Sequence, residues 1–345
     1  MKNRIDLSKY NIRTDLLIES DGINNSNVNV KDINDNIKVT TTYVDDDLSK
    51  SLLRKIGTYI TIEFEDITNY EDRVEVSNQL CIEIRNILND LNIKDKDKCL
   101  IIGLGNANST ADSLGPKVVD KVLVTRHLFE LNTLVKEGIR CVSAISPGVM
   151  ASTGIETLDI IHSLVAKIKP DFIIVIDSLA SLSIDRLNKT IQITDTGINP
   201  GSGVGNNRKE ISKDNLGIPV IAVGVPTVVY SSIIVNDTIN YLFKHISYIK
   251  NNYDMNKLIF TRKDYSKKLK DNDLSIEEKE ELSGIIGTLN DDDKISLINE
   301  VLNGVNYNLI VTPKEIDFLV DKLSMVIGNG INKSLHREVS DDNLL

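Results

Sequence analysis

The chain has 345 residues, of which 41% are hydrophobic and 26% are charged, and its formal net charge is −10. This length and composition indicate a folded protein of one large or two modest domains and exclude a disordered chain or a membrane protein. The negative charge excludes a non-specific DNA or RNA binder, which needs a basic surface to displace counterions.

The beginning of the chain and the cysteines bear on the compartment. Charges are scattered through the first residues without an apolar run, which is not the pattern of a secretory signal. The three cysteines, Cys81, Cys99 and Cys141, are an odd number without CxxC spacing, which is typical of a reducing compartment. We therefore expect a cytoplasmic protein with no membrane contact.

The first hundred residues contain an arm, a strand and a helix. Residues 1–50 are polar, rich in Asn and Asp and weakly periodic, and are interpreted as an irregular leading arm. Residues 57–65 alternate apolar and polar side chains as a half-exposed strand does. Residues 71–92 place apolar side chains at helical spacing after an acidic start, which predicts a helix.

The middle block, residues 99–250, alternates apolar strands with amphipathic helices. The expected strands span 99–106, 138–146, 171–180, 190–197 and 217–226, and the expected helices span 117–131, 153–170 and 232–248. In 153–170, Thr153 is the expected N-cap and Glu156 its capping-box partner. This alternation predicts an α/β fold with three layers, in which helices cover both faces of a mostly parallel sheet.

The tail, residues 251–345, is expected to be a helical extension. Its last predicted helix spans 312–328, with Thr312 as N-cap, Pro313 at the first helical position and Glu315 as the capping-box partner.

Ligands in open α/β sheets lie at the carboxyl ends of the strands, and the first such end carries Asp112. Gly103 and Gly105 after the strand suggest a dinucleotide-binding turn. The third glycine of that motif would fall at position 108, which is Asn108, so the dinucleotide reading is rejected. What remains is Asp112 in a polar loop between a strand and a helix.

The second strand end carries Asp177. It ends the apolar run of 172–176, and a charged carboxylate at the mouth of a buried strand is costly unless it has partners or a task. An Asp that caps the next turn is the structural alternative. Asp112 and Asp177 together satisfy the minimum for catalysis by a carboxylate pair, in which one ionised Asp activates water and a protonated one donates to the leaving group. A metal site on the same two carboxylates lacks an evident third ligand.

The third strand end carries Asp195, followed by Thr196 and Gly197. This triplet matches the signature of pepsin-type proteases, but that mechanism needs two copies in an all-β fold. The glycines that follow it are interpreted as an anion-binding nest or a substrate-channel loop beside Asp195, and they are Gly201, Gly203 and Gly205.

Several long blocks in one order carry a family resemblance. They are GLGNANSTADSLGP (103–116), LVTRHLFEL (123–131), SPGVMASTGIET (146–157), IDSLAS (176–181), NKTIQITDTGINPGSGVGNNRK (188–209), GIPVIAVGVPTVV (217–229) and NLIVTPKEID (308–317). With these blocks the chain resembles the germination protease of spore-forming bacteria over essentially its whole length.

The resemblance implies an endopeptidase that starts the degradation of small acid-soluble spore proteins in the cytoplasm of the forespore and the spore core. It implies an inactive precursor that removes its own propeptide, residues 1–15, by cleavage between Asp15 and Leu16. It also implies an atypical aspartic-type site on Asp112 and Asp177, no cofactor or metal, and a homotetramer with no direct contact to nucleic acid.

The implied fold is similar to that of hydrogenase-maturation endopeptidases, which hold a metal at the corresponding place. With the strand order, the resemblance favours a single elaborated α/β domain over residues 16–345, with its catalytic block at 99–250 and its helical extension at 251–345. Two alternatives remain open: a metal-dependent peptidase that uses the same carboxylates, and an inactive relative that binds spore proteins.

The chain also departs from the pattern that the resemblance leads us to expect. An aromatic residue and a proline are replaced by Ala107 and Ala111, a basic residue after the Asp177 strand by Leu182, and an acidic residue by Tyr230. None of these changes removes the two aspartates.

Overall fold

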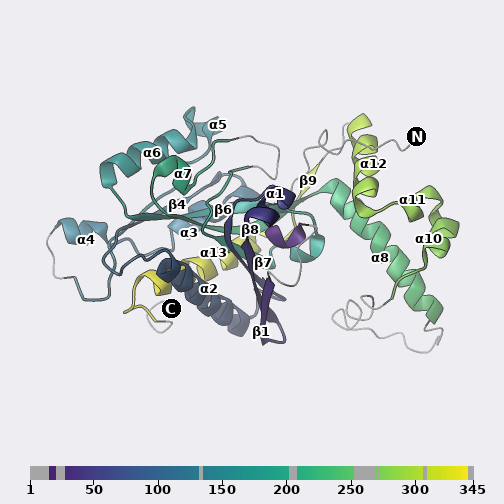
Figure 1. The fold of residues 1–345 in the computed structure, drawn as a ribbon, viewed down its shortest axis with the longest axis horizontal. Helices are drawn as coiled ribbons and strands as arrows, with labels where there is room; N and C mark the ends of the chain where they lie inside the picture. Colours follow the sequence, from purple (N-terminus) through teal and green to yellow (C-terminus); the bar gives the residue numbers. More distant parts are fainter. Residues whose placement is uncertain are drawn as a thin grey trace. The chain divides into compact units, whose positions relative to one another are not determined.

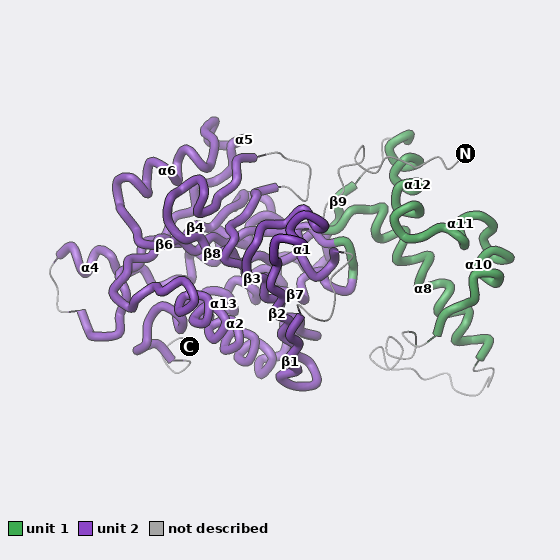
Figure 2. Tube along the Cα trace, viewed as in Figure 1, with its two compact units in different colours: residues 1–12, 182–184, 229–311 green, residues 13–181, 185–228, 312–345 purple. Residues whose placement is uncertain are grey.

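The computed structural model describes residues 15–20, 28–131, 135–201, 208–251, 269, 272–305 and 309–340. Two compact units are coloured separately in Figure 2. The sheet unit comprises Arg13–Ser181, Asp185–Val228 and Thr312–Leu345, and the helical unit comprises Leu182–Ile184 and Val229–Val311 with the chain's first residues. The division of the chain into a propeptide and a single domain stays a prediction.

The strands of the sheet unit lie in the order β1-β2-β3-β7-β8-β6-β4-β5. Their bounds are β1 Val28–Asn34, β2 Ile37–Val44, β3 Gly57–Phe64, β4 Cys99–Gly103, β5 Val142–Ile145, β6 Phe172–Ser181, β7 Thr190–Thr194 and β8 Val220–Tyr230. All the strands expected from the sequence are present, and the α/β class is confirmed.

The sheet is mixed, which corrects the expectation of a mostly parallel one. Strand β4 pairs in parallel with β5 and β6, whereas β1-β2, β2-β3, β3-β7 and β7-β8 pair antiparallel. The difference comes partly from the leading arm, where β1 and β2 form a hairpin around Asp35 and Asn36, and partly from β7, which runs antiparallel to both β3 and β8. β1 is mostly exposed and rich in Asn and Asp, so its sequence lacks the apolar alternation that identifies a half-buried strand.

Apolar side chains alternate between the two faces of the central strands, and each face is covered by helices (Figure 1). Phe172, Ile174 and Ile176 of β6 join the core beneath α2 (Tyr70–Asp90), α3 (Leu114–Val119) and α13 (Ile316–Leu335). Ile173 and Val175 face the opposite core, which includes Ile161 of α6 (Thr157–Ile168) and Leu216 of α7 (Lys213–Leu216). The three expected layers are therefore present.

Short elements complete the sheet unit. They are the 3-10 turns η2 (Leu17–Glu19) and η4 (Thr110–Asp112) and the helices α1 (Asp46–Leu52), α4 (Arg126–Glu130) and α5 (Met150–Thr153); the 3-10 turn η5 (Ile184–Arg186) bridges the two units along the chain.

Two predicted helix starts are displaced. The expected N-cap Thr153 is the last residue of α5, and α6 begins at Thr157 after Glu156. The expected N-cap Thr312 instead donates its hydroxyl to the backbone oxygen of Thr227, and α13 begins only at Ile316. In the second case a tertiary hydrogen bond takes the side chain that local capping would use.

The helical unit contains α8 (Ser231–Asn251), α10 (Ile276–Ser283), α11 (Ile285–Thr288) and α12 (Asp291–Gly304), and the short strand β9 (Ile310–Val311), which pairs with the end of β8. Lys294 of α12 donates to Asn240 of α8 and pairs with Asp291. The expected extension 251–345 is thus divided, because α13 belongs to the sheet unit and packs on α2 through the core. No described helix is long and apolar enough to cross a bilayer.

Two glycines allow α3 to pack directly on the end of β4. A Cβ atom at Gly115 would lie 2.2 Å from the backbone oxygen of Leu104, and one at Gly103 would lie 2.2 Å from the backbone oxygen of Gly115. This contact fixes the chain that follows η4, and therefore fixes the position of Asp112.

We expect Gly115→Ala to destabilise the protein by about 1–3 kcal/mol, since the added methyl group meets backbone that cannot move independently. Gly304→Ala on α12 is the control, because a Cβ there meets nothing within 4 Å. The control should leave stability unchanged or raise it by up to about 1 kcal/mol. Urea unfolding followed by circular dichroism measures both, and equal midpoints for the two variants would contradict the packing argument.

Candidate active site

Asp177 lies within β6, which continues to Ser181, and 5% of its surface is exposed. Parallel pairing of β4 with β6 puts Gly103 opposite Ile176, and the amide of Leu104 donates to the backbone oxygen of Ile176 at 2.8 Å. The end of β4 therefore runs beside Asp177 at the same edge of the sheet. One carboxylate oxygen of Asp177 accepts a hydrogen bond from the amide of Ser178 at 2.9 Å.

Asp112 is brought back to this edge by a tight loop after β4. Gly105 has a φ of +111°, and a Cβ there would lie 2.0 Å from the backbone oxygen of Asp112. The amide of Asn106 donates to both the backbone oxygen and the Oδ2 of Asp112, at 3.0 and 2.9 Å. The hydroxyl of the buried Thr227 donates to the backbone oxygen of Ala111 at 2.6 Å. The Asp112 carboxyl is therefore held by the amide of Asn106, and β8 holds the backbone next to it at Ala111.

Burial raises the pKa of both aspartates, and neighbouring negative charges act on Asp177 as well. Burial raises the pKa of Asp177 well above its ordinary value of 3.8, and the negative charges of Asp112 and Asp15 raise it further. The Ser178 hydrogen bond and the positive charge of Arg208 oppose this rise. Burial also raises the pKa of Asp112, against the Asn106 hydrogen bond and the Arg208 charge. The structure thus brings together the two aspartates predicted from the sequence, close enough for the charge of Asp112 to raise the pKa of Asp177.

The segment around Asp15 and Leu16 lies on β6 beside this pair. The amide of Ala180 donates to the Oδ2 of Asp15 at 3.0 Å, and the Asp15 amide approaches the Ala180 oxygen at 3.4 Å. Leu16 and Leu17 are 0% and 1% exposed, and Leu17 packs against Val44 and Tyr59. The bond expected to be cleaved is therefore held inside the sheet unit, next to the strand that carries Asp177.

Asp195 occupies a different position from the pair. Its Oδ1 accepts from the amide of Thr58 at 2.9 Å, which fastens the end of β7 to the start of β3. Burial raises the pKa of Asp195, and the Thr58 hydrogen bond opposes the rise. Gly201 has a φ of +71°, whereas Gly203 and Gly205 lie outside the described residues. A direct substrate role for Asp195 and these glycines stays a prediction.

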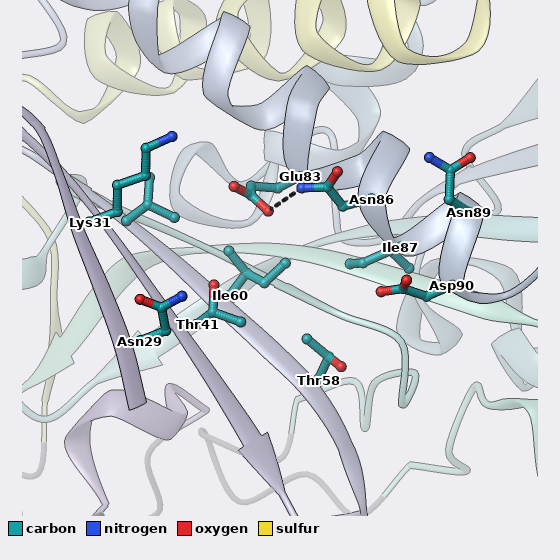
Figure 3. Close-up of a pocket in the computed structure, with 11 residues that line it drawn as sticks. Asn29, Lys31, Thr41, Thr58, Ile60, Glu83, Asn86, Ile87, Asn89 and Asp90 are labelled. Atoms are coloured by element: carbon teal, nitrogen blue, oxygen red, sulfur yellow. Dashed lines mark hydrogen bonds between the residues drawn. The ribbon is translucent and has the colours of Figure 1, made fainter. Parts of the chain in front are cut away.

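Cavities lie at two places among the described residues of the sheet unit. One of about 120 Å³ borders Asp15 and is lined by Leu179 of β6, Gly224 of β8 and Gln192 of β7, although Asp177 itself does not line it. The other, of about 450 Å³, lies between α2 and strands β1 to β3 (Figure 3). In it, Asn86 donates to Glu83 at 3.1 Å, and none of the three candidate aspartates lines it. The cavity beside Asp15 is therefore the one associated with the candidate site.

Several residues of the site were missed by the sequence analysis. Arg208 ends the glycine-rich block and Thr227 lies within β8, but nothing in their local sequence connects them with Asp112. Gln192 belongs to the regular alternation of β7, where a single polar residue is unremarkable. Asn106 could have been predicted as part of the site, because it follows Gly105 in the loop at the end of the first strand.

The donor set does not fit a zinc site. Such a site takes three or four protein ligands, and the pair supplies two carboxylates, one of them buried with a raised pKa. Within the described ranges, no group of three or more His, Cys, Asp or Glu side chains is arranged to hold a metal ion.

Comparison with known proteins places the chain in a family. A family model described as germination protease matches residues 11–345. The chain belongs to the germination protease family. Germination proteases of Bacillus cereus strain AH187, Bacillus anthracis and Geobacillus sp. strain WCH70 are each 44% identical to it, over 99% of this chain and 98% of each relative. The resemblance read from the sequence is confirmed, and this germination protease family member is an endopeptidase.

Among solved structures, the NiFe hydrogenase maturation protease HycI from Thermococcus kodakarensis KOD1 is similar to part of the chain. It is 17% identical, and the match covers 41% of this chain and 80% of that one with a TM-score of 0.24. A likeness at this score carries no argument about the site.

The raised pKa of Asp177 predicts how stability depends on pH. The folded state keeps the Asp177 proton at pH values where the unfolded chain has lost it, so this group destabilises the fold increasingly as pH rises above about 4. We expect Asp177→Asn to raise the melting temperature at pH 7 to 8, with the gain shrinking towards pH 4. Asp32→Asn on the exposed β1 is the control, and thermal unfolding at each pH is the measurement. A lower melting temperature for Asp177→Asn at pH 8 would contradict the burial argument.

Proposed function

We propose that this protein is made as a precursor that cleaves its own Asp15–Leu16 bond and then cleaves small acid-soluble spore proteins. The observation that carries the proposal is the position of the Asp15 segment on β6, where the charge of Asp15 acts on the pKa of Asp177. In this proposal residues 1–15 are the propeptide.

The two aspartates divide the chemistry between them. Asp177 is the more deeply buried and holds the proton of the pair, while Asp112, with the Asn106 hydrogen bond and the Arg208 charge, is ionised. Asp112 takes a proton from water as the oxygen attacks the Asp15 carbonyl carbon, and Asp177 donates its proton to the Leu16 nitrogen. The C–N bond breaks, and the water supplies the new carboxyl group of Asp15.

The setting follows from the family. We infer that the enzyme works in the cytoplasm of the forespore and the spore core, as a homotetramer, without a cofactor and without direct contact to nucleic acid. Support comes from three relatives named germination protease, and from the net charge of −10, which disfavours binding to the DNA that the substrates coat.

Intact-mass spectrometry of the purified chain tests the processing step. We expect a species that begins at Leu16 to accumulate at mildly acidic pH and to form more slowly as pH rises and Asp177 loses its proton. Asp112→Asn and Asp177→Asn should each slow this cleavage by about 10²–10⁴-fold, because each removes one proton-transfer group. Asp32→Asn should process at the wild-type rate.

The same assay decides between the alternatives. Cleavage that stops with a chelator and returns with a divalent metal would establish the metal-dependent peptidase instead. A chain that never processes and leaves a purified spore protein intact would establish the inactive binding protein. Full processing by either aspartate variant would refute the roles given to the pair.

A further inference from the structure

Gln192 makes two hydrogen bonds that flank the Asp15–Leu16 bond. Its Nε2 donates to the backbone oxygen of Asp15 at 3.0 Å, and its Oε1 accepts from the amide of Leu17 at 2.7 Å. The first of these partners is the carbonyl oxygen of the bond that the proposed processing breaks. The side chain is 7% exposed, so both contacts are shielded from water.

The backbone partners fix which way the amide of Gln192 points. A backbone N–H can only donate and a carbonyl can only accept, so the oxygen must face Leu17 and the NH₂ must face Asp15. The Leu17 contact therefore orients the donor towards the Asp15 carbonyl. The side-chain amide of Gln192 therefore offers one donor and one acceptor to the backbone of residues 15 and 17, as the backbone of a neighbouring β-strand would.

The sheet places this donor on the face that also carries Asp177. Residues 191 and 193 of β7 join one core, which puts Gln192 on the opposite face, shared with Val175 and therefore with Asp177 and Leu179 of β6. Strand β8 lies between them, and its residue opposite Gln192 is Gly224, on which the side chain of Leu179 packs. Two strand spacings amount to about 10 Å, and Asp15 bridges them from Ala180 to Gln192.

We propose that the amide of Gln192 is the oxyanion donor of this protease, a role that rests on the proposed cleavage at Asp15–Leu16. When water attacks the Asp15 carbonyl carbon, the π electron pair of the C=O bond moves onto the oxygen, and the Gln192 Nε2 stabilises the negative charge. The C=O bond forms again as the C–N bond breaks and the Leu16 nitrogen takes the proton from Asp177. Preorganised donors of this kind contribute about 10²–10³-fold to the rate.

The assignment extends to later substrates. Gln192 recognises only backbone atoms of residues 15 and 17, so it accepts any extended peptide whose carbonyl occupies the same position. Removal of the propeptide releases the Asp15 carbonyl and leaves the donor available for the scissile carbonyl of a second polypeptide.

Gln192→Glu is the main test, because it keeps the size of the side chain and the acceptor for Leu17 but loses the donor when ionised. We expect its processing rate at neutral pH to fall by about 10²–10³-fold relative to the wild type. A protonated carboxyl can donate again, so the ratio of variant to wild-type rate should recover as pH falls. The titratable groups that line the cavity around this position are Asp15, Arg54, Lys55, Tyr59 and Glu210.

Gln192→Met is the matched comparison, since it fills similar space but has neither donor nor acceptor. Its rate should fall similarly and show no recovery at low pH. Hydrogen exchange of residues 15–20, measured in the uncleaved Asp112→Asn background, should show protection kept in Gln192→Glu and lost in Gln192→Met. Asn89→Asp, on the exposed end of α2, adds the same charge elsewhere and should process normally.

The outcomes distinguish a failure of the Gln192 proposal from a failure of the proposed cleavage at Asp15–Leu16. If the wild type forms no Leu16 species, or if Asp112→Asn and Asp177→Asn cleave normally, the processing mechanism itself fails. If they behave as expected but Gln192→Glu processes within about 3-fold of the wild type at neutral pH, only the donor role of Gln192 is refuted. Equal slowing of both Gln192 variants without recovery at low pH would also refute it, and would reduce Gln192 to holding the segment.

Discussion

A carboxyl group buried at the end of an apolar strand is the constraint on which the site depends. An isolated ionised carboxylate in such a place costs so much that the group retains its proton instead. Asp177 is such a group. The turn at Gly105 and the hydroxyl of Thr227 hold the loop that carries the Asp112 carboxyl group, whose charge raises the cost of ionising Asp177 further. Two acids in one poorly solvated place ionise at different pH values, and that difference allows one to accept a proton while the other gives one.

The aspartate pair was predictable because the information is local. An apolar run that ends in Gly before a polar loop identifies the end of β4, and the Asp that interrupts the apolar run of β6 lies beside that end, because the two strands are parallel. The hairpin of β1 and β2 was not predictable in this way, because β1 is exposed and its Asn and Asp residues look like an irregular segment. The predicted start of α13 was wrong for a related reason. The hydroxyl of Thr312 bonds to the backbone of Thr227, 85 residues away, and does not cap its own helix.

The remaining parts of the site depend on contacts between distant residues. Gln192 and Leu17 are 175 residues apart, and Thr227 and Ala111 are 116 apart. A polar side chain in the middle of a strand gives no sign of which backbone atoms it will meet. The Thr227 contact also explains why Ala111, which replaces an expected proline, does not disturb the loop that carries Asp112. Thr227 bonds only to the backbone oxygen of residue 111, which alanine supplies as well as proline does.

In the proposed precursor, the burial of Leu16 and Leu17 beside β6 makes the segment around the Asp15–Leu16 bond a tethered inhibitor. A peptide segment that belongs to the same chain occupies the cleft at a fixed effective concentration, whatever the number of molecules in the compartment. Diluting or concentrating the precursor therefore does not change the fraction of clefts that are filled. In this proposal an external substrate has to compete with the tethered segment, so the timing of proteolysis is set by cleavage of the Asp15–Leu16 bond and by the pH around it.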